Sequence, residues 1–202
     1  SFVTGLDADP FDEVCDHLVV EELETHQVVG TYRLQTGPTA AAKRGYYSEL
    51  EFEFAPYEPL RAELLELGRA CVHKDHRNLA VLNLLWKGVA AYARERGARY
   101  LIGCSSLTSQ DPLAGASMYA GLQRKHLVKP DWRTLPLPAL ACPLEQLLEP
   151  PFKVPKLLAA YLAFGAKICG PPAIDREFKT IDFLTFIDLH SLSARTVARY
   201  LS

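Results

Sequence analysis

The hydrophobic period of this sequence changes several times along the chain, and this alternation limits the possible folds more than any other feature. Over residues 78–97 the apolar side chains fall at steps of three and four, which predicts an amphipathic helix with Asn78 as N-cap and Gly97 as C-cap. The segments before and after it, 64–73 and 100–105, favour strands. Strands alternating with helices predict a mixed α/β sheet with helices packed on it.

Further segments extend this pattern in both directions. Residues 17–21 and 27–34 are rich in β-branched side chains and are separated by a short polar stretch, which predicts an antiparallel hairpin. Residues 113–126 favour a second helix, because the basic residues at its end suit a helix C-terminus. The remaining expected elements are strands over 168–173 and 181–188, joined by a polar turn, and helices over 156–164 and 193–201.

Prolines mark the one long interruption. Seven of them lie from Pro130 to Pro155, which predicts a surface excursion or arm rather than core structure. With the apolar helix that follows, this proline-rich insertion spans 130–165. A length of 202 residues fits a single domain over 1–202.

Composition excludes several classes of function. Twenty-two Lys and Arg against 24 Asp and Glu give a net charge of −2, so we expect no nucleic-acid partner. The five cysteines are widely spread and form no CxxC pair, which argues against a disulfide framework and a zinc site and favours a reducing cytoplasm. No signal peptide or membrane-spanning run is visible, and we expect a cytoplasmic protein.

The first candidate site is the pair Glu66 and Arg69. In a regular strand these side chains point to opposite faces, but a bulge, which Gly68 would permit, brings them together. Such a bulge would splay two strands and expose backbone N–H groups that polarise a carbonyl, beside a glutamate able to act as a base. The alternative is a structural ion pair.

Three other features allow both a functional and a structural interpretation. The helix start after Arg77 offers N–H groups to a phosphate, or is simply a capped helix without a nucleotide-binding glycine pattern. The acidic opening from Asp7 to Asp16 could bind an amine or form a solvated turn. His73 and His76 lack a helical scaffold, so we expect no metal site there, and Cys104 suits packing better than covalent catalysis.

Short motifs follow one another in a recognisable order along nearly the whole chain. They are Asp7-x-Asp9-x-Phe11-Asp12, Cys15-Asp16-His17-Leu18-Val19-Val20, Val29-Gly30-Thr31-Tyr32-Arg33-Leu34, Glu66-Leu67-Gly68-Arg69-Ala70-Cys71-Val72-His73, Leu85-Trp86-Lys87-Gly88, Gly103-Cys104-Ser105, Tyr161-Leu162-Ala163-Phe164-Gly165-Ala166 and Gly170-Pro171-Pro172-Ala173-Ile174-Asp175 with Phe178. In this order they resemble the ornithine-acyl-carrier-protein N-acyltransferases, many of whose relatives are labelled hemolysin-like.

This resemblance implies a GNAT acyltransferase fold, a mixed and mostly antiparallel sheet flanked by helices, related to the acyl-homoserine lactone synthases. It implies Glu66 and Arg69 as catalytic residues. Substrate-binding candidates are Asp9, Asp12, Arg33, Cys104 and Ser105, and candidates for holding the donor's phosphate are Val72, His73, Arg77, Asn78, Leu79 and Ala80.

The resemblance also implies the substrates. No tightly bound cofactor is expected; the co-substrate is an acyl thioester of phosphopantetheine, on acyl carrier protein or coenzyme A. Because no glycine lies between Gly68 and Gly88, a carrier protein with its single phosphate fits better than coenzyme A. The acceptor is the amine of ornithine or another amino acid, and the acyl chain is long, with or without a 3-hydroxyl group.

Partners and alternatives complete these expectations. An acidic carrier protein would dock on a basic surface formed by Lys74, His76, Arg77, Arg124, Lys125 and Lys129. Residues 157–164 would allow peripheral contact with the inner face of the membrane, or form a core helix. The alternatives are an acyl-homoserine lactone synthase with S-adenosylmethionine as acceptor, and a non-catalytic, acyl-binding, membrane-associated protein.

Overall fold

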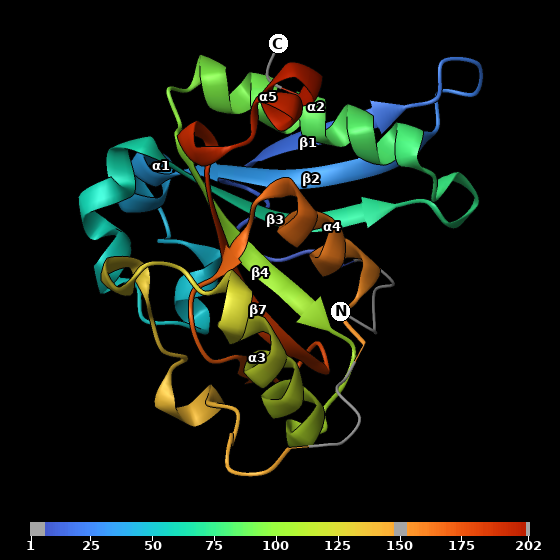
Figure 1. The fold of residues 1–202 in the computed structure, drawn as a ribbon. Helices are drawn as coiled ribbons and strands as arrows, with labels where there is room; N and C mark the ends of the chain where they lie inside the picture. The colour runs from blue at the N-terminus through green and yellow to red at the C-terminus, as the bar shows by residue number, and fades with distance from the viewer. Residues whose placement is uncertain (1–6, 148–152, 201–202) are drawn as a thin grey trace.

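The computed structural model describes residues 7–147 and 153–200, and its centre is a seven-stranded sheet (Figure 1). The strands lie in the order β1-β2-β3-β4-β7-β5, and β6 pairs with β7 beside β5. Only β3 and β4 run parallel, and every other pair is antiparallel. The expected mixed, mostly antiparallel sheet is therefore confirmed. Its strands are β1 Asp16–Glu21, β2 Val28–Thr36, β3 Leu64–Val72, β4 Tyr100–Leu107, β5 Lys167–Ile168, β6 Ala173–Asp175 and β7 Thr180–Asp188.

Helices cover one face of this sheet. As predicted, α2 (Leu79–Glu95) starts after Asn78, whose Oδ1 accepts hydrogen bonds from the N–H groups of Ala80 and Val81 at 2.9 and 3.1 Å. Past its end, Gly97 has a φ of +67°, the left-handed conformation that glycine adopts without strain. The other helices are α1 Gly37–Ala42, α3 Pro112–His126, α4 Lys156–Phe164 and α5 Ala194–Tyr200. Figure 1 shows α2, α3 and α4 in front of the sheet.

The helix α4 belongs to the core. Leu158 is buried, and the rings of Tyr161 and Phe164 contact Trp86 of α2 at centroid distances of 6.1 and 5.2 Å. The hydroxyls of Tyr161 and Tyr32 are hydrogen-bonded to each other. One side of α4 therefore packs against the core, whereas Leu157 is 37% exposed, and contact of this helix with a membrane stays a prediction. Among the described residues, no helix has the length and apolarity needed to cross a bilayer.

The opposite face of the sheet is covered by residues 37–63, a segment for which the sequence predicted no element. It contains α1 and two 3-10 helices, η1 (Tyr47–Leu50) and η2 (Ala55–Glu63). Aromatic rings hold it to the sheet: Tyr57 stacks on Phe186 of β7 at 6.0 Å, and Phe54 contacts Tyr57 at 5.1 Å. We call this side the η1 face. It carries alternate residues of β3 and β4, namely Leu64, Glu66, Ile102 and Cys104.

The predicted surface excursion or arm after Pro130 packs against the core at its start, because the Trp132 ring lies 4.7 Å from that of Phe186 and Thr134 is buried. For the rest of this stretch the interpretation stays a prediction. One expectation for the C-terminal half is wrong. The expected strand 168–173 is split into β5 and β6, because Pro171 and Pro172 lack the N–H that a sheet ladder requires.

The centre of the sheet is split along the line between β3 and β4. The two strands pair at only three positions, with Leu64 opposite Tyr100, Leu65 opposite Leu101 and Glu66 opposite Ile102, and they separate beyond that point. On the other side of β3 the register with β2 shifts between Thr31 and Arg33. The bulge and the splayed strands that the sequence predicted are therefore confirmed.

The backbone strain of the bulge lies on an unexpected residue. Gly68 was predicted to provide the flexibility, but Arg69 is the residue with a positive φ, +52°. The left-handed conformation costs a residue with a Cβ about 1 kcal/mol or more, so surrounding contacts must fix it. The ion pairs of Arg69, described below, are such contacts.

Gly103 lies where the strands separate, and its replacement gives a direct test of the splay. A Cβ at this position would lie 2.1 Å from the carbonyl oxygen of Leu67, a backbone atom with little freedom to move. We expect Gly103→Ala to lower the free energy of unfolding by about 3 kcal/mol, at the upper end of overpacking effects, in urea denaturation.

The matched control is Gly121→Ala in α3, where a Cβ meets nothing within 4 Å. Because alanine is the better helix former, this variant should gain up to about 1 kcal/mol. Equal effects of the two substitutions would contradict the close contact between Gly103 and Leu67.

Candidate active site

A cavity of about 380 Å³ opens where β3 and β4 separate. Its apolar wall includes Leu101 and Ile187 of the sheet and Leu157, Leu158 and Tyr161 of α4. Its polar wall combines β2, β3, β4, β6, β7 and the η1 segment. The polar and ionisable side chains that line it are Arg33, Gln35, Tyr47, Ser48, Glu51, Glu66, Arg69, Cys104, Ser105, Ser106, Asp175, Thr180, Asp182 and Thr185.

Glu66 lies on the η1 face at the last pair before the strands separate. Its side chain is only 5% exposed, and its two oxygens accept hydrogen bonds from the backbone N–H groups of Tyr47, at 2.9 Å, and Ser48, at 2.8 Å. Burial raises the pKa of Glu66, against the opposing effect of these N–H groups and of the Arg33 charge. A carboxyl with a raised pKa inside a cavity suits general base catalysis.

Arg33 and Arg69 are held together by the acidic residues at the start of the chain. Arg33 Nη1 donates to both oxygens of Asp9, at 2.7 and 2.8 Å, and to Asp12 Oδ1 at 2.7 Å. Arg69 Nη2 donates to Asp9 Oδ2 at 2.7 Å, and Arg69 also pairs with Asp7. Glu66 and Arg69 thus share a face because of the bulge, but Arg69 pairs with aspartates, and the predicted ion pair with Glu66 does not form.

These contacts determine the charge state of the acidic opening. Burial alone would raise the pKa of Asp9, but the hydrogen bonds from Arg33 and Arg69 outweigh it and the pKa is lowered. The solvated-turn interpretation is therefore wrong for Asp9 and Asp12, whereas the side chains of Asp7 and Asp16 are 69% and 58% exposed. Arg33 and Arg69 line the cavity, whereas Asp9 and Asp12 lie behind them and orient them.

Cys104 and Ser105 both line the cavity but point to opposite faces of β4. Cys104 Sγ lies 3.6 Å from Ser48 Oγ and 4.0 Å from Glu51 Oε2. Burial and the neighbouring Glu51 raise the pKa of Cys104 well above the usual thiol value, so this side chain is no activated nucleophile. Ser105 Oγ lies 3.2 Å from Thr185 Oγ1 on the other face.

Three carboxylates that the sequence analysis did not select also line the cavity. One oxygen each of Glu51, Asp175 and Asp182 lie within 4.8 Å of one another. Burial, together with the charges of Asp182 and Asp175, raises the pKa of Glu51 to about 9. The available signal was Asp182 itself, a charged residue that stands between the apolar Ile181 and Phe183 inside strand β7.

The residues expected to hold the donor's phosphate lie outside this cavity, in the turn from β3 to α2. Asn78 uses its side chain to cap α2, Leu79 is 72% exposed, and the Arg77 Nε donates to the Val72 carbonyl at 3.4 Å. Val72 ends β3, His73 follows it and Ala80 lies in the first turn of α2, and none of the six residues lines the cavity. Their proposed contact with a phosphate stays a prediction.

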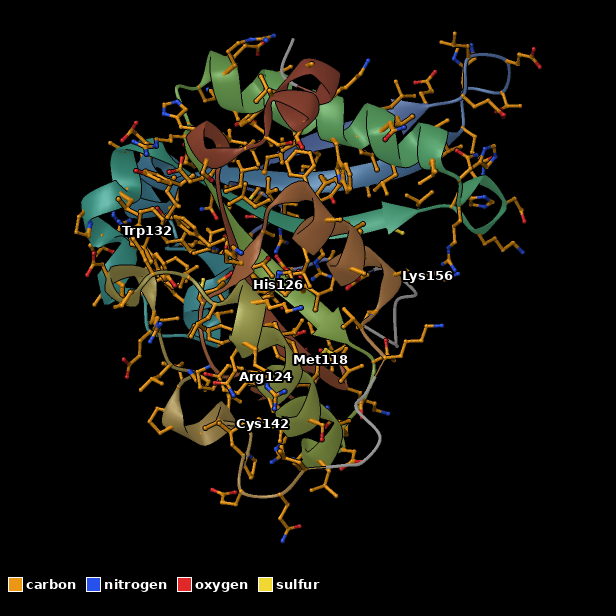
Figure 2. All side chains as sticks on the ribbon, in the orientation of Figure 1. Met118, Arg124, His126, Trp132, Cys142 and Lys156 are labelled. Carbon is orange, nitrogen blue, oxygen red and sulfur yellow. The ribbon has the colours of Figure 1, made fainter. Side chains whose placement is uncertain are left out.

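The basic residues expected to form one docking surface do not lie together. Lys74 and His76 are in η3 (Lys74–His76), at the far end of β3, whereas Arg124 lies on α3, and Figure 2 shows these places well apart. A partner that used all of them would have to span the face that carries α4.

Comparison with known proteins agrees with this geometry. The sequence matches an acetyltransferase (GNAT) domain family over residues 2–87. It is 34% identical to an L-ornithine N(alpha)-acyltransferase of Agrobacterium fabrum, over 96% of this chain and 71% of that protein, and 32% identical to the corresponding Brucella abortus protein, over 96% and 74%.

A solved structure extends the likeness to three dimensions. The acyl-homoserine lactone synthase LasI superimposes with a TM-score of 0.51 at 12% identity, covering 96% of this chain and 73% of that one, which shows a shared fold. The two relatives at 34% and 32% identity carry the assignment of the family. The chain is an acyltransferase of the GNAT type and belongs to the family of the L-ornithine N(alpha)-acyltransferases.

Proposed function

We propose that this protein transfers a long acyl chain from the phosphopantetheine thioester of an acyl carrier protein to the α-amine of ornithine. The observation that carries the proposal is the cavity at the splayed strands, which combines a buried glutamate with an apolar wall under α4. Ornithine is the substrate named in the relatives, and it enters here as the acceptor.

The chemistry is a direct transfer without an acyl-enzyme intermediate. Glu66 takes a proton from the α-ammonium group, directly or through a water, and the free amine attacks the thioester carbonyl. A C–N bond forms, the C–S bond breaks, and the thiol of phosphopantetheine leaves with a proton. Each Glu66 oxygen has a second lone pair that its backbone partner does not use, so the carboxylate can accept this proton in place.

Two further groups bind the substrates in this proposal, a backbone N–H of the bulge and an arginine side chain. Ala70 lies in the bulge of β3 and lines the cavity, and its backbone N–H is our choice for binding the developing oxyanion. Arg69 also lines the cavity, and its guanidinium, fixed by Asp7 and Asp9, is placed to bind the acceptor's carboxylate. The apolar side chains of α4 face the acyl chain.

The decisive experiment measures thiol release from 3-hydroxyacyl carrier protein and from the matching acyl-coenzyme A. Each donor is tested with a panel of free amino acids and with S-adenosylmethionine, and products are identified by mass. We expect release from the carrier protein that depends on ornithine and yields the Nα-acyl product. Release from coenzyme A alone would overturn the donor assignment, and no release by the folded protein would overturn the function.

A further inference from the structure

The three carboxylates of Glu51, Asp175 and Asp182 form an acidic cluster at the polar end of the cavity. Asp182 stands opposite both Ser106 of β4 and Ala173 of β6, so it lies on the η1 face, and Asp175, two residues after Ala173, lies there too. Glu51 follows directly after η1. Glu51 and Asp182 are only 5% and 4% exposed, so this cluster differs from the acidic groups that solvent surrounds on a surface.

The cluster has no cation among the residues that the structure describes. None of the ion pairs within residues 7–147 and 153–200 includes any of the three carboxylates. The repulsion inside the cluster is one cause of the raised pKa of Glu51 given above. Because burying like charges without a counterion is costly, the empty cluster keeps a proton on Glu51 at neutral pH, and a bound cation would take the place of that proton.

Two unpartnered oxygen atoms point to a ligand that donates hydrogen bonds. Asp182 Oδ2 accepts from Thr180 Oγ1 at 3.0 Å, but the buried Oδ1 of the same carboxyl has no hydrogen-bond partner. Gln35, opposite Glu66 on β2, is 2% exposed and lines the same cavity, and its Oε1 also has none. Such orphaned acceptors are rare in folded proteins unless a ligand or water satisfies them.

We propose that the acidic cluster binds the side-chain ammonium group of the acceptor amino acid and so selects a diamino acid. This inference rests on the proposed function, because it assumes that an amino acid enters the cavity. An ammonium group has three N–H donors and one positive charge, which matches three converging carboxylate oxygens.

The position of the cluster places the two amines of the acceptor at different carboxylates. Ser48 connects the two sites, because its backbone N–H donates to Glu66 at 2.8 Å and its Oγ lies 3.6 Å from Cys104 Sγ, which in turn lies 4.0 Å from Glu51. With the side-chain ammonium held in the cluster, the α-amine is directed toward Glu66 and the thioester. Glu66 then removes a proton from the α-ammonium group, while the side-chain ammonium group keeps its positive charge.

The test compares ornithine with norvaline, which has the same carbon chain but lacks the side-chain amine. In the wild type, kcat/KM for ornithine should exceed that for norvaline by roughly 30-fold or more. Asp182→Asn should remove most of this preference, lowering kcat/KM for ornithine at least about tenfold more than kcat/KM for norvaline. Glu51→Gln is the second variant and should act in the same direction.

Asp188→Asn is the matched control, since Asp188 lies on the same strand but pairs with Arg99 at 2.8 Å, and it does not line the cavity. It should keep the ornithine preference. The melting temperature gives an independent test, because the two variants should change it in opposite directions. Asp182→Asn relieves repulsion in the empty cluster and should raise Tm. Asp188→Asn breaks an ion pair and should lower Tm.

Each outcome bears on one claim. If Asp182→Asn slows acylation of ornithine and norvaline equally, the cluster does not recognise the ammonium and the inference is wrong. If wild-type activity with ornithine is lost in EDTA and restored by Mg²⁺ or Zn²⁺, the cluster is a metal site and the inference is also wrong. If the wild type acylates no amino acid at all, it is the proposed function that fails.

Discussion

Glu66→Gln is expected to lower kcat/KM for acyl transfer by roughly 100-fold or more, the usual contribution of a general base. Glutamine keeps the shape of the side chain but cannot accept a proton from the acceptor's ammonium group. Steady-state thiol release measures the loss. The pH profile supplies a second criterion: wild-type kcat/KM should rise with pH as Glu66 deprotonates, at a pH above the ordinary carboxyl range because burial raises its pKa, and the variant should lack this rise.

The control must account for the role of Glu66 in holding η1. Glu49 offers the same chemistry outside the cavity, because its Oε2 accepts a hydrogen bond from the Tyr46 N–H at 3.0 Å at the start of η1. Glu49→Gln should therefore disturb η1 without removing the base, and its pH profile should match the wild type. Comparable losses of kcat/KM in both variants would show that Glu66 only positions η1.

Arg33→Met is expected to lower the free energy of unfolding by about 3 kcal/mol. Arg33 is 4% exposed and supplies the positive charge shared by Asp9 and Asp12. Without Arg33, the neighbouring negative charges of Asp9 and Asp12 repel each other, and among the described residues Arg69 is the one arginine left to balance them. Since these carboxylates are 18% and 27% exposed, water offsets part of the loss, which places the estimate at the lower end for buried ion pairs.

Urea denaturation of three further variants, Arg96→Met, Asp9→Asn and the double variant Arg33→Met/Asp9→Asn, separates this effect from a general loss of charge. Arg96→Met removes an exposed ion pair with Asp16 at 3.4 Å and should cost less than about 1 kcal/mol. Combining Arg33→Met with Asp9→Asn should cost less than the sum of the two single changes, because both remove the same interaction. Strict additivity would contradict the coupling of Arg33 and Asp9.

The elements with a clear period were predictable from the sequence. The helix α2 has its apolar residues on one stripe and a side-chain cap at Asn78, so its local signals agree with its packing. The sequence offered the bulge in β3 only as a condition: Glu66 and Arg69 share a face if the alternation of the strand is broken, which Gly68 would permit, and the structure shows that it is broken. The position of the strained residue in this bulge was not predictable. Ion pairs with Asp7 and Asp9 hold Arg69 in the left-handed conformation, which sequence statistics assign to glycine.

The rest of the site depends on contacts between distant parts of the chain. The 3-10 turns of residues 37–63 have no helical period, and they are fixed by rings such as Phe186, far along the sequence. Glu51 and Asp182 meet only because η1 covers the strand pair β4 and β7. No spacing rule connects two residues that are brought together by the order of strands in a sheet.

The split between β3 and β4 divides the sheet into two mechanical units. One is β1-β2-β3, the other is β4 with β5, β6 and β7, and only three residue pairs join them in the backbone ladder. The side chains that line the cavity lie on both units, with Glu66 and Arg69 on the first and Cys104 and Asp182 on the second. A small rotation of one unit against the other would separate these side chains without breaking a strand, so the shape of the cavity depends on a seam with fewer backbone pairs than the neighbouring pair β4 and β7.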